Sequence, residues 1–582
     1  MYTSEENCRI VIALLKAHGI KKIIASPGTT NITFVGSVQN DPFFEVFSAI
    51  DERHAAYLAV GMAAECGEPI VLSCTGATAS RNYLPGLTEA YYRKLPILAI
   101  TGSRVFTLKG QLTDQFIDRT QIQKDVATIS VWCPIVTANH IRDYCERVTN
   151  EAILALKRHG GGPAHIILET QYARDFSVSE LPKVQKIERY TYTDEKWPEI
   201  SAQTKVVVYV GAHHRFAPEE KVALERFVRT HQAVVIVSPV SSYDGYGAIS
   251  AQLLCTQGVK GNPKYAQLTP DLLINIGEIS ADYAKGYFSQ IAPVWRVSED
   301  GEIRNLYGRL ENVFEVDDQT FFGHYDGKAE SDGSYLAAWQ AADSVMRSKV
   351  PELPFSNNWI GRELYKRLPS GCGFHAGILS SVRSMGYMEP FQDKECFCNV
   401  GAFGIDGNVS TLIGAALVRP DKLFVGMVGD LSFFYDLNAL GNRHIGNNIR
   451  LIVVNNGMGA EFTLYHNCGE SLGDKVYDYV SAGGHFGRQS RQLVKHYAED
   501  LGFKYLAAEN QESFLKNIDM FLNKVSDRSV VMECFVDPKA EVEAWQRMSS
   551  IEKYVPPATL RSTVKKCLPQ GLKKVIKSVT RS

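Results

Sequence analysis

Short apolar segments that end in glycine, serine or proline recur along the chain, and a helical segment follows each of them. Residues 22–25 run into Ser26-Pro27-Gly28, and residues 206–210 and 423–428 each run into a glycine. Parallel strands need such crossovers, and strands covered on both faces are apolar throughout. The pattern therefore predicts an α/β protein built from doubly wound parallel sheets.

The chain is too long for one such sheet, because 582 residues exceed what a single hydrophobic core supports. Three blocks of strands and helices can be distinguished, and charged or proline-containing linkers at 183–199 and 349–358 separate them. We therefore expect a first domain over residues 1–185, a central Rossmann-like domain over 200–345 and a third domain over 355–540.

Composition excludes several classes of protein. The net charge of −2 gives no field that would attract nucleic acid. The 12 cysteines include no C-x-x-C pair, which argues against a zinc site or a disulfide scaffold. No apolar signal core opens the chain, and no apolar stretch approaches the roughly 20 residues that span a bilayer. A reduced, cytoplasmic location is expected.

The most specific pattern lies in the third block, where one apolar strand ends at Asp430 and the next ends at Asn455-Asn456, with a helical segment from about residue 434 between them. If the strands are neighbours, their carboxyl ends lie about 4.8 Å apart. One Mg2+ could then take oxygen ligands from Asp430 and Asn456. Gly429 and Gly457 would let a diphosphate approach the backbone. Alternatively, Asp430 is a helix N-cap and the asparagines are turn residues.

Gly-Asp followed about 25 residues later by Asn-Asn resembles the metal signature of thiamin-diphosphate-dependent decarboxylases and carboligases. Gly429-Asp430-Leu431-Ser432 and the segment 435–440 are similar to the menaquinone-pathway synthases of that family, although many members have glycine in place of Leu431. The resemblance implies thiamin diphosphate and Mg2+ as cofactors. It also implies metal ligation by Asp430, Asn456 and the main-chain oxygen of Met458, and contacts of Gly429 and Ser432 with the diphosphate.

A second carboxyl stands where a strand over residues 45–50 meets a helix of small and apolar residues that Glu52 opens. A carboxyl that is mostly buried at such a place would have a raised pKa. The segment resembles the family motif whose glutamate sets the tautomer of the cofactor's aminopyrimidine, and Ser26-Pro27-Gly28 and the segments 74–79 and 82–86 continue the match. The alternative is that Glu52 only complements the helix dipole.

Two further positions match the family by resemblance. Gln115 resembles an active-site glutamine that contacts the substrate or the 4′-amino group, and it could instead be a surface glutamine. Ile405, between Gly404 and Gly407, matches the apolar wedge that bends the cofactor, and it could equally be a core residue.

Departures from the family bear on the substrate. Val400 and Phe403 replace an arginine and a serine of the menaquinone synthases, and an arginine after Gly28 is also missing. Arginines bind carboxylates through two parallel hydrogen bonds, so their loss removes recognition of a dicarboxylate and favours a smaller donor such as pyruvate. Arg383 and Arg104 remain as candidate substrate contacts. Three histidines are candidate proton relays near the site: His54, His466 and His485.

The resemblance implies a carboligase that removes CO2 from a 2-oxo acid and adds the remaining acyl group to an acceptor carbonyl. A simple decarboxylase of the phosphonopyruvate or sulfopyruvate type is the nearest alternative, and a non-catalytic scaffold with the same fold is another. In this family the site lies between two subunits, so a homodimer or homotetramer is expected.

The tail over residues 553–582 contains no acid, and its basic residues punctuate an apolar pattern. It resembles a basic amphipathic helix, which would make peripheral contact with an anionic inner-membrane surface. An enzyme held there could serve the synthesis of surface-polysaccharide precursors. A disordered solubilising tail is the alternative.

Overall fold

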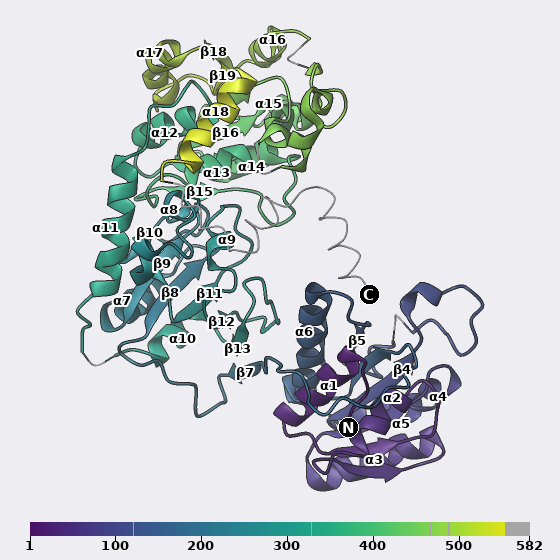
Figure 1. Cartoon of the computed structure of the whole chain (residues 1–582). Helices are drawn as coiled ribbons and strands as arrows, with labels where there is room; N and C mark the ends of the chain where they lie inside the picture. The colour runs from purple at the N-terminus through teal and green to yellow at the C-terminus, as the bar shows by residue number, and fades with distance from the viewer. Residues whose placement is uncertain (120–121, 328, 465–466, 487–488, 553–582) are drawn as a thin grey trace, which may run out of the picture. The chain divides into compact units, whose positions relative to one another are not determined.

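The computed structural model describes residues 1–119, 122–327, 329–464, 467–486 and 489–552, and the predicted basic tail lies outside these ranges. The chain divides into two compact units (Figure 1). Unit 1 contains residues 1–197 and 299–316, and unit 2 contains residues 198–298 and everything after 316. The predicted α/β class is confirmed, because the main sheets are parallel and helices alternate with their strands. In the described residues, no helix is long and apolar enough to cross a membrane.

Unit 1 is built on a six-stranded parallel sheet in the order β2-β1-β3-β4-β6-β5. Its strands are β1 (Lys22–Ala25), β2 (Glu45–Ser48), β3 (Ile70–Cys74), β4 (Ile97–Ser103), β5 (Ile129–Cys133) and β6 (Ala164–Glu169). Its longer helices are α1 (Glu6–Ala17), α2 (Ile32–Val38), α3 (Glu52–Cys66), α4 (Thr78–Asn82), α5 (Leu84–Tyr92) and α6 (Asn139–Ala155).

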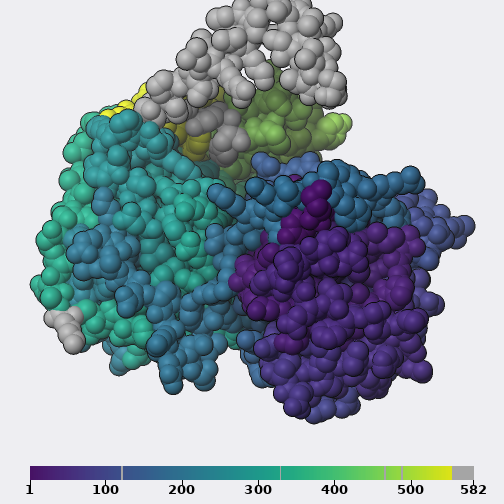
Figure 2. All heavy atoms as spheres, turned by 60° about the horizontal axis from the view of Figure 1, so that its bottom comes forward, coloured from purple at the N-terminus to yellow at the C-terminus, as the bar shows by residue number. Residues whose placement is uncertain are grey.

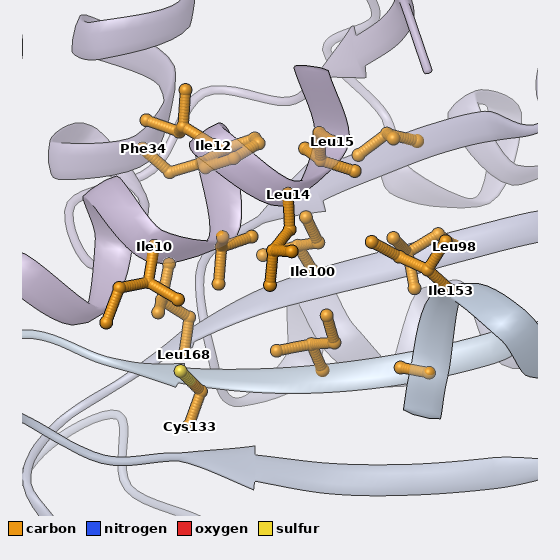
Figure 3. Packing of buried hydrophobic residues seen from close by; sticks show 14 of the residues in the cluster. Ile10, Ile12, Leu14, Leu15, Phe34, Leu98, Ile100, Cys133, Ile153 and Leu168 are labelled. Atoms are coloured by element: carbon orange, nitrogen blue, oxygen red, sulfur yellow. The ribbon is translucent and has the colours of Figure 1, made fainter. Parts of the chain in front are cut away.

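Both faces of this sheet are covered, as the apolar strands predicted. Leu98 and Ile100 of β4 enter the core beneath α1 and α6 (Figure 3), whereas Ile97 and Ala99 enter a second core beneath α3 and α5. Successive residues of a strand point to opposite faces, so one strand contributes to two cores. On the face drawn in Figure 2, the side chains of this unit pack into a continuous surface.

The predicted linker at 183–199 is wrong in part. Residues Glu188–Thr191 form strand β7, which pairs in parallel with β13 (Leu310–Glu315) inside unit 1. Arg158 helps to hold this pair, because its guanidinium contacts Glu302 at 3.0 Å and Glu315 at 3.2 Å. Residues 299–316, which include β13, cluster with unit 1.

Unit 2 contains one complete six-stranded sheet and five strands of the seven-stranded sheet. These five strands are parallel in the order β10-β9-β8-β11-β12, with β8 (Lys205–Val210), β9 (Gln232–Val237), β10 (Ala248–Ile249), β11 (Leu272–Ile276) and β12 (Val294–Val297). Around it lie α7 (Pro218–Thr230), α8 (Gln252–Cys255), α9 (Lys285–Phe288), α10 (Asp318–His324) and α11 (Ser334–Ser348).

The other sheet of unit 2 carries the pattern that the sequence singled out. Its parallel order is β15-β14-β16-β17-β19-β18, with β14 (Gly373–Ala376), β15 (Glu395–Phe397), β16 (Phe424–Gly429), β17 (Ile449–Asn455), β18 (Lys504–Ala508) and β19 (Val530–Phe535). Its helices are α12 (Asn357–Arg367), α13 (Ser380–Met385), α14 (Asn408–Val418), α15 (Asp430–Tyr435), α16 (Leu493–Asp500), α17 (Gln511–Leu522) and α18 (Pro538–Ser549).

Candidate functional site

Strands β16 and β17 are neighbours, as the sequence predicted. They pair in parallel with Gly429 opposite Val454, so Asp430 and Asn455-Asn456 leave the sheet at the same edge. The predicted start of the following helix near residue 434 is wrong, because α15 begins at Asp430 itself. Gly429 occupies the N-cap position, which excludes the interpretation of Asp430 as the cap. The carboxyl edge of a parallel sheet is where ligands bind in such folds.

Asp430 is a buried carboxyl that no cationic side chain contacts in the described part of the chain. It is 3% exposed, and its two oxygens accept hydrogen bonds from the main-chain N–H groups of Leu431 at 3.0 Å and Gly457 at 2.9 Å. Burial raises the pKa of Asp430 to about 7. A buried carboxyl without a positive partner is costly, and a bound metal ion would remove that cost.

A second buried acid, Glu541 of α18, lies within electrostatic reach of Asp430. Burial raises the pKa of Glu541 to about 7, and the negative charge of Asp430 adds to the rise. The Glu541 carboxylate accepts from the main-chain N–H of Asn357 at 3.0 and 3.1 Å and from the side chain of Asn456. Glu541 therefore fixes the amide of Asn456, which the sequence had singled out as a metal ligand.

The two asparagines have different surroundings. Asn455 donates to Glu533 Oε1 at 2.6 Å, and Tyr505 donates to the other oxygen of Glu533 at 2.8 Å. Asn456 accepts from the N–H of Met458 at 3.2 Å, which is the contact of an ordinary turn asparagine. The oxygen of Asn456 can accept a second interaction, and so can the main-chain oxygen of Met458.

The two glycines of this edge, Gly429 and Gly457, have different backbone conformations. Gly457 has a φ of +74°, which few other residues adopt, whereas Gly429 has an ordinary φ of −72°. A Cβ placed on Gly429 would meet no atom within 4 Å, so open space lies over its backbone. The described residues contain no cluster of three or more His, Cys, Asp or Glu side chains suited to a metal. One carboxylate with amide and carbonyl oxygens does fit a hard cation such as Mg2+.

Replacing Glu541 by glutamine should weaken Mg2+ binding by about 10- to 100-fold, the usual effect of removing a group that orients a ligand. Glutamine can donate as well as accept, so it no longer holds the Asn456 amide in one orientation. Titration calorimetry with Mg2+ and thiamin diphosphate measures the change, and Glu543→Gln on the exposed side of α18 is the control. Unchanged Mg2+ affinity in Glu541→Gln would show that Asn456 is positioned by other contacts.

Ser432 and Ile405 are joined by hydrogen bonds. The Ser432 hydroxyl donates to the main-chain oxygen of Ile405 at 2.6 Å, and Asn408 donates to both groups. Asp436 fixes the same loop by accepting from the N–H and hydroxyl of Ser410. The hydroxyl proton of Ser432 is thus already engaged. Ile405 is half-buried on a loop and does not belong to the closed core.

In unit 1, Glu52 is the first residue of α3, after an N-cap at Asp51 that accepts from the N–H groups of Arg53 and His54. Glu52 is half-buried in the single chain, whereas the neighbouring Ile50 is 82% exposed. Burial raises the pKa of the Cys74 thiol to about 12, and the charge of Glu52 adds to this rise. Glu52 therefore acts electrostatically on the end of β3.

Two residues with strained backbone conformations follow strands β3 and β14. Ala77, after β3, has φ 57° and ψ −133°, and Leu379, after β14, has φ 70° and ψ −116°. Both stand at the N-cap of a helix in a region of φ and ψ that is normally reserved for glycine. Strain of this kind persists only where the surrounding structure imposes it, and it occurs often at functional sites.

The other sequence-predicted residues each have surroundings of their own within their unit. Gln115 is exposed in unit 1 with a φ of 56°. Arg104 is paired with Asp114 at 2.8 Å. In unit 2, Arg383 is paired with Glu461 and lies over the Tyr283 ring, 4.7 Å from its centroid. His54 and His485 are exposed, and His466 lies outside the described residues.

Several residues of the site gave no signal in the sequence. The pattern of strands located Asp430 and Asn456, but Glu541 sits in an ordinary amphipathic helix after β19 and Glu533 sits within that strand. An acid inside an otherwise apolar strand, as at Glu533, was the only hint that could have been followed. Asn408 and Asp436 also gave no signal, because both look like ordinary residues at the ends of helices.

Comparison with known proteins agrees with the geometry. Residues 8–125 match the family described as thiamine pyrophosphate enzyme, N-terminal TPP binding domain. The chain is 31% identical over 558 residues to a 2-succinyl-5-enolpyruvyl-6-hydroxy-3-cyclohexene-1-carboxylate synthase from Bacteroides thetaiotaomicron, which covers 92% of this chain and 96% of the relative. A synthase of the same name from Bacteroides fragilis is 28% identical and covers 92% of this chain and 97% of its own length. Another from Desulfotalea psychrophila is 26% identical and covers 90% of this chain and 96% of its own length.

Proposed function

Because the chain belongs to the family of thiamine pyrophosphate enzymes, we propose that it is a carboligase that takes a 2-oxo acid as donor. It removes CO2 from the donor and joins the remaining acyl group to the carbonyl of an acceptor. The observation that supports the proposal most is the buried, uncompensated Asp430 beside Asn456 at the shared edge of β16 and β17. That arrangement fits a metal ion that anchors a diphosphate.

Bound thiamin diphosphate would supply a sink for the electrons that remain when CO2 leaves. Asp430, Asn456 and the main-chain oxygen of Met458 would hold Mg2+, and the open backbone at Gly429 would lie against the diphosphate. Ile405, fixed through Ser432, would press on the cofactor from the neighbouring loop. Glu52 would hold a proton at the aminopyrimidine, and Gln115 would orient the substrate.

The donor that fits best has a single carboxylate. Arg383, the candidate arginine of unit 2, is already neutralised by Glu461. Val400 and Phe403 stand where the related synthases carry an arginine and a serine. A second carboxylate on the donor would therefore find no free guanidinium at these positions, which favours pyruvate over 2-oxoglutarate.

CO2 release from a panel of 2-oxo acids tests this preference. We expect kcat/KM for pyruvate to exceed that for 2-oxoglutarate by at least about tenfold, the value of one well-formed charged hydrogen bond. Glu461→Gln frees the Arg383 guanidinium and should narrow the difference, with Glu470→Gln on the exposed surface as control. A preference for 2-oxoglutarate in the unchanged protein would overturn the donor assignment.

Product analysis separates the carboligase from its alternatives. Free aldehyde as the sole product, with every candidate acceptor unused, would identify a simple decarboxylase of the phosphonopyruvate or sulfopyruvate type. Failure to bind thiamin diphosphate would leave a scaffold with the same fold.

The exposed apolar side chains of Ile50 and Phe47, beside the half-buried Glu52, support an arrangement in which a second subunit covers this edge. A homodimer or homotetramer follows, and sedimentation would show it. Contact of the tail over residues 553–582 with anionic membranes stays a prediction, which a flotation experiment with phosphatidylserine vesicles and the tail-deleted chain would test.

A further inference from the structure

Unit 1 contains a buried arginine, Arg119, that pairs with no carboxylate in the described part of the chain. Arg119 is 6% exposed, and its guanidinium donates through Nη1 to the hydroxyl of Thr101 at 2.6 Å and through Nη2 to the main-chain oxygen of Gly102 at 3.1 Å. Its Nε is buried and has no hydrogen-bond partner among the described residues. Both acceptors are neutral, so the positive charge of Arg119 stays uncompensated in a poorly solvated place, which is costly.

The surroundings of Arg119 add positive charge. Burial lowers the pKa of Arg119 to about 10, and the charge of the nearby Arg81 contributes to the fall while the Cys74 thiol opposes it. Burial and both guanidinium groups lower the pKa of His165 to about 3, so this imidazole is neutral. The acids of the adjoining loop are engaged elsewhere, because Asp118 pairs with Lys109 at 2.9 Å and Asp114 pairs with Arg104.

A small cavity lies against this group. It has a volume of about 20 Å³, which is room for one water-sized particle. Its lining includes the polar side chains of Ser80, Arg81, Tyr83, Thr101, Arg119 and His165, and apolar side chains close the rest. The wall of the cavity thus contains two guanidinium groups, three residues with hydroxyls and a neutral imidazole, and no carboxylate lies among its lining residues.

Arg450 is a second buried arginine without a carboxylate partner among the described residues, and main-chain oxygens compensate its charge. It is fully buried and donates to three main-chain oxygens, those of Asn447, Ile449 and Asn523. Asn523 ends α17, and the negative end of a helix dipole favours a cation. Arg119 has one carbonyl partner and faces a second guanidinium, so it lacks this compensation.

We propose that the cavity beside Arg119 binds one small monovalent anion of the size of chloride, held between Arg119 and Arg81. Arg81 is exposed and donates to the main-chain oxygen of Asp118 at 3.1 Å. Water in the cavity would satisfy the free Nε of Arg119 but would leave the buried charge of Arg119 unmatched. The anion also has a structural consequence, because Arg119 Nη2 lies 3.5 Å from the place of a Cβ on Gly76. Gly76 belongs to the turn that carries the strained Ala77, and the main-chain oxygen of Gln115 approaches it from the other side. Anion binding therefore steadies the turn and the Gln115 loop.

Crystals of the full-length protein grown in sodium bromide test the site directly. We expect an anomalous difference peak within hydrogen-bond distance of Arg119 Nε. A cavity that contains only water in bromide, with no anomalous signal, would overturn the proposal.

Thermal unfolding in solution gives a second test. At constant ionic strength, replacing sodium gluconate by sodium chloride should raise Tm in a saturable way. Arg81→Met should weaken the apparent chloride affinity roughly tenfold, and the exposed position of Arg81 leaves the fold intact. Arg93→Met removes an exposed charge from the same unit and should change nothing. A Tm that does not respond to chloride, or an unaltered response in Arg81→Met, would also contradict the proposal.

Discussion

Replacing Asp430 by alanine should abolish binding of thiamin diphosphate and lower the rate of CO2 release by at least about 10³-fold. Asp430 supplies a carboxylate at the edge of β16 and β17 where the metal would bind, and its loss removes several kcal/mol of interaction with a divalent ion. The apoprotein should keep most of its stability. Alanine removes a buried charge that nothing offsets, but it also frees the N–H groups of Leu431 and Gly457, so the two effects oppose each other.

Calorimetry and thermal unfolding with Mg2+ and thiamin diphosphate measure this result. In the unchanged protein, cofactor at about 100 times its Kd should add about 2.7 kcal/mol to the free energy of unfolding, and in Asp430→Ala it should add none. Asp421→Ala, at an exposed position before β16, is the matched control and should behave like the unchanged protein. Normal cofactor binding in Asp430→Ala would place the metal elsewhere and remove the basis of the proposed function.

The parts of the structure that the sequence predicted well share a physical cause. Strand β16 and residues 451–454 of β17 are apolar because helices cover both faces of their sheet, and that pattern can be read without any knowledge of partners. Adjacency of Asp430 and Asn456 followed, since a short crossover returns the second strand beside the first. The start of α15 was misplaced because Gly429-Asp430 looks like a turn before a helix, whereas here the helix begins directly at the strand end.

Features that depend on distant contacts could not be predicted. Strand β7 is polar and half-buried, so its residues look like a linker until β13 pairs with it. Glu541 reaches the metal-binding edge only because α18 packs near α12 and brings it to Asn357. Arg119 likewise looks like one charge in a polar loop, and only the fold shows that no acid meets it. A sequence pattern reveals the periodicity of apolar residues along the chain. It does not reveal which buried charges lack an oppositely charged partner in the folded structure.

The surroundings of Glu52 are only partly closed in the single chain. Glu52 is half-buried, but the nearby apolar side chains of Ile50 and Phe47 are 82% and 41% exposed. Unit 1 therefore offers an incomplete environment, which a second subunit would complete. In that case the properties of Glu52 depend on assembly, and they cannot be read from one chain.

Replacing Glu52 by glutamine should accordingly lower kcat by about 10²- to 10⁴-fold, the usual contribution of a positioned acid or base, while cofactor affinity changes little. Glutamine preserves the shape of the side chain and the start of α3, but it cannot share a proton with the aminopyrimidine. Glu65→Gln, at an exposed position on the same helix, controls for the lost charge and should keep full activity. Steady-state kinetics and calorimetry measure both quantities. Full activity in Glu52→Gln would show that Glu52 has no role in proton transfer, and so would a loss of activity caused only by failure to bind thiamin diphosphate. The position of Glu52 at the start of α3 would then reflect its interaction with the helix dipole alone.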